Sequence, residues 1–161
     1  MYKTNRKGSE NETAGDTWLS RIYMNTEIIK EIVPKFFEVG FYNQKYYDIV
    51  VTDKRIILAW MGETYRPWML RVDPGMYKRK EFEKLNIDDV VNYNEKNVII
   101  DYEDIEKVEL KKRTFFKNGY IYIKTKNNEF KLYNKDKKLN YDDLLMTLQG
   151  FMGKKVIFNE S

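Results

Sequence analysis

The first long hydrophobic pattern, in residues 26–40, has the spacing of an α-helix. Its apolar residues fall on one face of a helix: Ile28, Ile29, Ile32 and Val33. Thr26 stands at the N-cap position, Pro34 disturbs the pattern and Gly40 ends it. We therefore expect a helical N-terminal extension ahead of the strands.

From Tyr46 onward the pattern changes to short β-branched and aromatic runs. The polar residues 52–55 (Thr-Asp-Lys-Arg) lie between two such runs, YYDIVV before them and RIILAW, which begins at Arg55 itself. This arrangement predicts a tight β-hairpin. A third strand is expected over residues 65–72, where Pro67 favours an edge or a bend. Residues 73–75 (Asp-Pro-Gly) predict a turn.

The second half of the chain predicts more strands and one long helix. Residues 73–97 form an irregular insert with a short helix capped by Asn86. The strands are expected at Val98–Ile100, Ile105–Lys112, Gly119–Lys126 and Glu129–Tyr133. Asn140 is the expected cap of helix 141–152, whose apolar stripe is Leu144, Leu145, Leu148, Phe151 and Met152. Residues 154–158 form either a last strand or a tail.

Alternation along these strands predicts one shared interior. The inward side chains are expected to be Ile49, Val51, Val108, Leu110, Ile121, Ile123, Phe130 and Leu132. Short antiparallel strands must close or be covered, because open edges invite aggregation. The expected fold class is therefore mainly β (α+β), an antiparallel barrel or sandwich capped by a C-terminal helix.

The pattern predicts a single domain after a flexible tail. The expected parts are the tail 1–15, the domain 16–158, its helical extension 16–40, the barrel core 41–139 with the insert 73–97, and the capping helix 140–153.

Two residue types are absent from the 161 residues, and their absence excludes several classes of site. The sequence has no cysteine and no histidine, which excludes disulfides, Cys/His zinc sites and His-dependent nucleophiles. No Gly-rich phosphate loop occurs, so no cofactor is expected. No apolar run approaches the roughly 18 residues of a membrane span. We expect a cytoplasmic protein, peripheral at the membrane if it meets one.

Two segments resemble PH-like/GRAM-like domains, which in bacteria and archaea often occur as stand-alone proteins. Residues 50–58 (VVTDKRIIL) look like the hydrophobic–Thr-Asp-Lys-Arg–hydrophobic hairpin of that family, and residues 99–110 (IIDYEDIEKVEL) are similar to its I-x-Y-x-x-I-x-x-V-x-L segment. The resemblance spans roughly residues 40–153 and implies a bent sheet closed into a barrel. It also implies a non-catalytic module that binds lipids, peptides or proteins. The long stretch 61–97 departs from the family pattern.

Basic residues concentrate in one part of the chain. Residues 111–138 hold ten basic and two acidic residues, or +8, whereas the whole chain has a net charge of +4. The candidate binding residues on the outward face are Lys111, Arg113, Tyr120, Tyr122, Lys124, Lys126, Lys131 and Tyr133. Such a Tyr/Lys face suits a protein partner or an anionic lipid surface, with nucleic acid as an alternative. An ordinary solvated strand face has the same composition.

Two further candidates are weaker. Aromatic and basic residues between 60 and 69 suit a protein interface or a membrane-surface loop, and they are equally typical of simple core packing: Trp60, Tyr65, Arg66 and Trp68. Asp101 followed by Glu109 and Lys111 resembles the carboxylate–lysine set of Mg²⁺-dependent nucleases. Glu129-Phe130-Lys131 fits the same short pattern, so this enzyme hypothesis is remote. The sequence leaves the ligand and the oligomeric state open.

Overall fold

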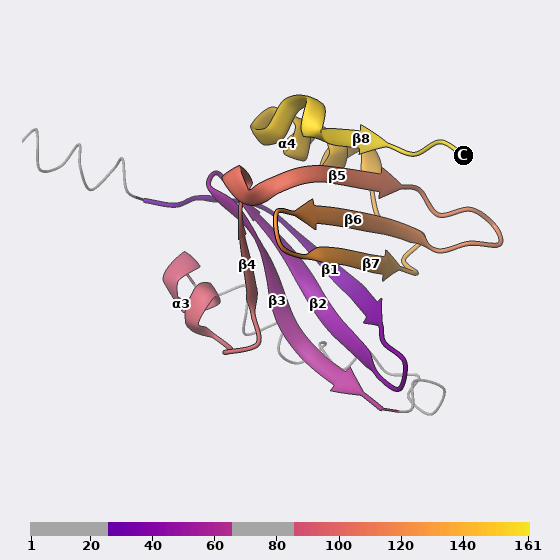
Figure 1. Cartoon of the computed structure of the whole chain (residues 1–161), viewed down its shortest axis with the longest axis horizontal. Helices are drawn as coiled ribbons and strands as arrows, with labels where there is room; N and C mark the ends of the chain where they lie inside the picture. Colours follow the sequence, from indigo (N-terminus) through magenta and orange to yellow (C-terminus); the bar gives the residue numbers. More distant parts are fainter. Residues whose placement is uncertain (1–25, 66–85) are drawn as a thin grey trace, which may run out of the picture.

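The computed structural model describes residues 26–65 and 86–161, which form one curved sheet and two α-helices (Figure 1). The order across the eight-stranded sheet is β4-β3-β2-β1-β7-β6-β5-β8. All its strand pairs are antiparallel except β5 with β8. The strands are β1 (Ile29–Val39), β2 (Gln44–Thr52), β3 (Arg55–Thr64), β4 (Val98–Asp101), β5 (Ile105–Lys111), β6 (Gly119–Thr125), β7 (Glu129–Asn134) and β8 (Val156–Phe158). The helices are α3 (Ile87–Asn92) and α4 (Tyr141–Met152), with short 3₁₀ turns at Tyr102–Asp104 and Gly153–Lys155.

The helix predicted over residues 26–40 is wrong, because this segment is the long strand β1. Its register with β2 shifts between Ile29 and Glu31 and again between Val33 and Phe36. Each shift inserts an extra residue, so residues three apart point to the same face. Adjacent apolar side chains of β1 pack into two separate hydrophobic clusters, one on each face of the strand, because β1 is covered on both sides at this point. The resulting spacing imitates an amphipathic helix.

The second shift in β1 is supported by buried polar side chains. Lys35 has a positive φ of 68°, and its backbone N–H donates to Oδ1 of Asp48 at 3.2 Å. The Pro34 carbonyl accepts from Nδ2 of Asn134 at 2.9 Å. Asp48 and Asn134 are both fully buried. Just beyond this bulge, β1 also pairs with β7 through Phe36 and Phe37, so the bulge lies where the two halves of the sheet meet.

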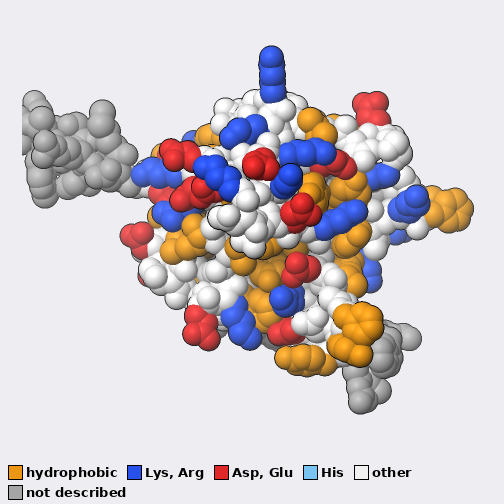
Figure 2. All heavy atoms as spheres, in the orientation of Figure 1, with side chains coloured by type: hydrophobic (Ala, Val, Ile, Leu, Met, Phe, Trp, Pro, Cys, Tyr) orange, Lys and Arg blue, Asp and Glu red, His pale blue; other side chains and the backbone are white. Residues whose placement is uncertain are grey.

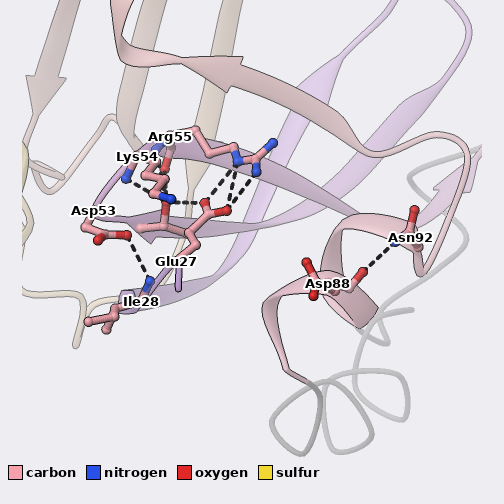
Figure 3. A network of polar contacts seen from close by, with 8 residues as sticks. Glu27, Ile28, Asp53, Lys54, Arg55, Asp88 and Asn92 are labelled. Carbon is pink, nitrogen blue, oxygen red and sulfur yellow. Dashed lines mark hydrogen bonds and ion pairs between the residues drawn. The ribbon is translucent and has the colours of Figure 1, made fainter. Parts of the chain in front are cut away.

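The predicted hairpin over residues 46–58 is confirmed as β2 and β3. Thr52 holds the turn, since its Oγ1 accepts the backbone N–H groups of Lys54 and Arg55 at 3.1 and 3.0 Å. The start of β1 is fastened to the same turn (Figure 3). Glu27 pairs with the Arg55 guanidinium at 2.7 Å, and Oδ1 of Asp53 accepts from the Ile28 N–H at 2.8 Å. Side-chain caps therefore replace the glycine that tight turns often use.

The expected shared interior is confirmed. The main cluster of buried apolar side chains draws on every strand and on α4, and it contains Ile49, Val51, Val108, Leu110, Ile121, Ile123, Leu132, Leu144 and Leu148, with Phe130 packed against it. Residues from both edge strands, Ile100 and Val156, belong to the same cluster. The sheet therefore curves around one interior, and α4 covers it. Asn140 caps α4 as predicted, accepting the Asp142 and Asp143 N–H groups.

A second, smaller cluster lies on the other face of β2 and β3. It consists of Val50, Ile57, Ala59, Met61 and Val90, the last of them on α3. Asn86 caps α3, as its sequence predicts, by accepting from the Asp89 N–H at 2.9 Å. The insert 73–97 thus supplies a helix that covers the outside of the sheet.

Residues 154–158 include the strand β8, parallel to β5, rather than only a tail. The tail 1–15, all but the first residue of the strand expected over 65–72, and the turn at 73–75 lie outside the described residues. Within the part of the chain that is described, no helix is long and apolar enough to cross a membrane. The fold is therefore mainly β, an eight-stranded mixed sheet with a C-terminal helix.

Candidate functional site

The outward face of β5, β6 and β7, here called the Tyr/Lys face, carries a regular array of tyrosine and charged side chains. Cross-strand pairing aligns them in three rows: Lys111, Tyr120 and Tyr133; Glu109, Tyr122 and Lys131; Lys107, Lys124 and Glu129. The inward residues between them are buried apart from the half-buried Phe130, whereas the array is exposed or half-buried. The residues that alternation assigned to the outward face of β6 and β7 therefore lie together.

Acidic side chains interrupt the positive charge of this face. Lys107 pairs with Glu109 at 2.9 Å, and Lys124 pairs with Glu106 at 3.4 Å. Lys126 lies 3.5 Å from Asp104. Figure 2 shows the blue and red side chains interspersed over these strands. The acids come from β5 and the turn before it, outside residues 111–138, so counting charge along the chain did not include them.

Lys131 covers two of the three tyrosine rings of the face. Nζ of Lys131 lies 4.4 Å from the ring centre of Tyr120 and 5.7 Å from that of Tyr133. Phe37 of β1 extends the aromatic row, 5.9 Å from Tyr133. Sequence reasoning missed Phe37, because residues 26–40 were expected to be helical. A planar ligand would have to displace Lys131 before stacking on Tyr120.

Glu109 stands at the centre of a hydrogen-bonded group. Its Oε1 accepts from the Tyr120 hydroxyl at 2.6 Å and from Nδ2 of Asn159 at 2.9 Å. The bond from Tyr120, followed by those from Asn159 and Lys107, lowers the pKa of Glu109 from 4.5 to about 2. The pKa of Tyr120 is raised, first by burial and then by its bond to Glu109. Glu109 is therefore an ionised, partnered carboxylate that joins the C-terminal segment to the face.

We expect the Glu109→Gln variant to lose less stability than the wild type when the pH is lowered. The folded-state pKa lies below the ordinary value of 4.5, so the ionised carboxylate stabilises the fold above about pH 4.5. That contribution disappears as the pH falls through about 2. After allowance for partial exposure it amounts to about 2 kcal/mol at neutral pH.

Urea unfolding at several pH values between 2 and 7 measures this contribution. The wild type should lose more stability than Glu109→Gln between pH 4.5 and 2. Glu103→Gln removes the same charge at an exposed position and should follow the wild type. Parallel curves for the wild type and Glu109→Gln would contradict the assignment.

The loop between β5 and β6, residues 112–118, presents two exposed aromatic side chains. Phe115 and Phe116 are 90% and 89% exposed, with ring centres 4.9 Å apart. Thr114 closes the loop, because its N–H donates to the Lys117 carbonyl at 2.9 Å and its Oγ1 accepts from the Lys117 N–H at 3.1 Å. Hydrophobic and basic atoms stand out together at the right-hand margin, where this loop ends (Figures 1 and 2).

Basic residues flank this aromatic tip: Lys111, Lys112, Arg113 and Lys117. Sequence reasoning counted these charges but missed Phe115 and Phe116. The signal available was a pair of phenylalanines that breaks the alternation between two strands, enclosed by basic residues. An apolar tip within a basic collar can enter the boundary of an anionic bilayer.

The candidate interface residues of the 60–69 segment are not brought together by what the structure describes. Trp60 is only 7% exposed and belongs to the main core cluster, because β3 turns its side chain inward beside Tyr47. Its ring therefore has little surface to offer a partner. Tyr65 is exposed, and Arg66 and Trp68 lie outside the described residues.

The residues of the nuclease hypothesis have separate surroundings. Asp101 ends β4 opposite Arg55, whereas Glu109 is bonded to Tyr120 and Asn159. Among residues 26–65 and 86–161, no group of three acidic side chains has the arrangement of a metal site. The geometry therefore gives this alternative no positive support.

Comparisons with known proteins yield distant structural likenesses. No protein-family model and no curated protein matches the sequence. The C-terminal domain of an unknown protein from Leishmania infantum is similar in structure, with a TM-score of 0.47 and 14% identity, over 88% of this chain and 98% of that one. The hSac2 domain from the human phosphoinositide phosphatase Sac2 is similar with a TM-score of 0.45 and 11% identity, over 95% of this chain and 93% of that one. At these TM-scores and identities, neither likeness assigns the chain to a family.

Proposed function

We propose that the chain is a non-catalytic, PH-like binding module that meets an anionic membrane surface through its β5–β6 loop and the adjoining Tyr/Lys face. The order of the elements along the chain supports the PH-like part of this proposal. Four antiparallel strands are followed by three more and then by a helix that covers the interior. The observation that carries the functional part is the exposed Phe115–Phe116 pair between basic residues.

The two kinds of side chain in the loop contribute in different ways. A phenylalanine ring leaving water contributes about 1.5–3 kcal/mol when it is fully buried, and a tip residue gains part of this in the headgroup region. Each lysine or arginine near an anionic bilayer contributes about 1 kcal/mol. Lys112 already pairs with Asp142 at 2.9 Å, so Lys111, Arg113 and Lys117 supply the remaining positive charge beside the tip.

The Tyr/Lys face adds a broader, weaker attraction. Its lysines are partly neutralised by Glu106, Glu109 and Asp104, and charge pairs at exposed positions are screened by salt. The face therefore favours a surface held by many weak contacts over a small ligand held tightly. It lies on the strands that carry the loop, so both features can meet one flat partner.

Vesicle sedimentation tests the proposal directly. We expect binding to vesicles that contain phosphatidylserine and much weaker binding to neutral phosphatidylcholine vesicles. The double variant Phe115→Ser/Phe116→Ser should weaken binding to the anionic vesicles by about tenfold or more.

A matched control uses the other exposed aromatic pair. Phe41 and Tyr42 lie in the β1–β2 loop and are also exposed, but no basic residues adjoin them in sequence. Phe41→Ser/Tyr42→Ser should retain binding. Equal binding to neutral vesicles, or unchanged binding of the folded Phe115/Phe116 variant, would reject the proposal.

Nucleic-acid binding on the Tyr/Lys face remains the alternative. Titration with single-stranded RNA at two salt concentrations distinguishes it, because phosphate contacts give a steep dependence on salt. The triple variant of Lys124, Lys126 and Lys131 to Glu should abolish such binding. The position of Lys131 over Tyr120 makes stacking less accessible and favours the membrane proposal.

A further inference from the structure

A carboxyl group points toward the interior of the curved sheet near the start of β1. Glu31 lies directly opposite Val51 of β2, a residue of the main core cluster. The adjacent pair, Ile32 with Val50, lies at the outer cluster instead. Because directly opposed residues of an antiparallel pair share one face of the sheet, Glu31 lies on the inner face. Val33, two residues further along β1, is a buried member of the main cluster.

The helix α4 packs against β1 on this inner face. It buries Leu144 and Leu148 toward the sheet. Asp143 and Thr147 each precede one of these leucines and are four residues apart, so they lie along one edge of the buried stripe. These two residues are the ones from α4 that act on the carboxyl of Glu31. The inward carboxyl group of β1 therefore meets one edge of α4.

One oxygen of the Glu31 carboxyl group is buried without a partner. Oε2 is inaccessible to water and accepts no hydrogen bond, although the residue as a whole is half-buried. A buried carboxylate oxygen that lacks a donor costs stability and disfavours the ionised form. The surroundings of Glu31 therefore suit a neutral carboxyl group better than a carboxylate.

No positive charge compensates an ionised Glu31. Among residues 26–65 and 86–161, no lysine or arginine forms an ion pair with it. The charged group that acts on it is Asp143 of α4, which is also an acid, and from β2 it faces the apolar Val51. Burial, followed by the charge of Asp143, raises the pKa of Glu31 from 4.5, although hydrogen bonding to Thr147 acts in the opposite direction.

The hydroxyl of Thr147 has only one proton to donate. It donates to the Asp143 carbonyl at 3.0 Å, and while it does so it offers Glu31 an acceptor oxygen alone. A protonated Glu31 can donate to that oxygen. An ionised Glu31 can accept from Thr147 only if the hydroxyl gives up its bond to the carbonyl. Hydrogen bonding at this position therefore also favours the neutral carboxyl group.

We propose that the contact of Glu31 with Asp143 and Thr147 is a pH-sensitive link between β1 and α4, in which protonation of Glu31 tightens α4 against the sheet. This contact contributes its full stability below about pH 4.5 and loses it as the pH rises through the higher pKa of the folded protein. The sign is opposite to that of Glu109, whose pKa is lowered. Because α4 covers the main core cluster, the contact affects how firmly the interior is closed.

Hydrogen exchange of the α4 amides measures this contact in the full chain. Exchange is followed by NMR from pH 4.5 to 7 and expressed as protection factors. In the wild type we expect the protection of residues 145–152 to fall about tenfold over this range, because one pKa unit corresponds to a factor of ten. Glu31→Gln keeps the shape of the neutral side chain, so its protection should stay high at pH 7. At pH 4.5 the two proteins should agree.

Two variants of α4 separate the charge beside Glu31 from other charges on the helix. Asp143→Asn removes the negative charge that acts on Glu31, and it should reduce the fall in protection. Asp142→Asn removes the same charge from the adjacent position, where the side chain pairs with Lys112 at 2.9 Å. This control should keep the pH dependence of the wild type.

Urea unfolding provides a second measurement for the case in which α4 exchanges only when the whole chain unfolds. At pH 7 the unfolding equilibrium constant of Glu31→Gln should be about tenfold smaller than that of the wild type, and at pH 4.5 the two should be equal. Equal constants at both pH values would reject the proposal. A fall in α4 protection of the same size in the wild type and in Glu31→Gln would also overturn it.

Discussion

Replacing Leu148 with alanine should lower the free energy of unfolding by about 2–5 kcal/mol. Leu148 lies on the inward side of α4, is fully buried and belongs to the main core cluster. The substitution removes apolar contacts and leaves a cavity between the helix and the curved sheet. The sheet cannot readily collapse into that cavity, because its strands are fixed by pairing to their neighbours. Urea unfolding monitored by tryptophan fluorescence measures the change.

The matched control is Met146→Ala on the same helix. Met146 is exposed, so its replacement should change stability by no more than about 0.5 kcal/mol. Similar effects of the two substitutions would mean that α4 does not seal the interior.

Asn134→Ala should destabilise the protein by about 2–4 kcal/mol, the second large effect that we expect. The amide of Asn134 donates to the Pro34 carbonyl at 2.9 Å and accepts from the Asp136 N–H at 2.7 Å. Asn134 is fully buried, so alanine would leave two part-buried backbone groups, the Pro34 carbonyl and the Asp136 N–H, without this partner. The same side chain joins β7 to the bulge of β1, where the two halves of the sheet meet.

Asn127→Ala provides the comparison for this prediction. Asn127 lies in the exposed turn between β6 and β7, and only its backbone N–H takes part in the turn, at 3.4 Å from Oγ1 of Thr125. Its replacement should alter stability by no more than about 0.5 kcal/mol. A small effect of Asn134→Ala, measured by the same urea unfolding, would show that the bulge is not held by this amide.

Both predictions concern the sheet and α4, and strands of the same sheet position the candidate site. Gly119 begins β6 directly beneath the Tyr141 hydroxyl, and β5 ends at the basic base of the Phe115–Phe116 loop. A membrane-facing loop on a rigid sheet loses less conformational entropy on binding than a free peptide would. The core and the proposed binding surface are therefore connected through the same strands.

Local patterns sufficed to predict most elements. The hairpin at residues 52–55, the strands of β6 and β7 and the cap at Asn140 depend on neighbours within a few positions. Turn chemistry, alternation and capping act at that range. The shared interior followed as well, because alternation with a period of two leaves each of these strands one apolar face.

The strand β1 could not be predicted from its own pattern. Its apolar residues serve both clusters, and two bulges change the phase of alternation within eleven residues. The supports for the second bulge come from Asp48 and Asn134, 13 and 100 residues away from their partners. Helical spacing was the reasonable local interpretation, and only long-range pairing overrides it.

The electrostatics of the candidate site likewise depended on pairing. The sequence showed a basic excess in residues 111–138, but strand register places Glu109 and Glu106 among those lysines. The Tyr141 hydroxyl and Nε of Arg113, which are buried without a hydrogen-bond partner, belong to segments that meet only in the folded chain. No spacing along the sequence marks them as neighbours.

By itself the sequence determined a cysteine- and histidine-free, mainly β domain with a capped C-terminal helix, because composition, alternation and capping are local properties. The tertiary structure decided that residues 29–39 form the strand that joins both halves of the sheet. It also decided which lysines are neutralised by acidic side chains. These outcomes depend on contacts between residues far apart in the chain, whose energies exceed local preferences once the core is buried.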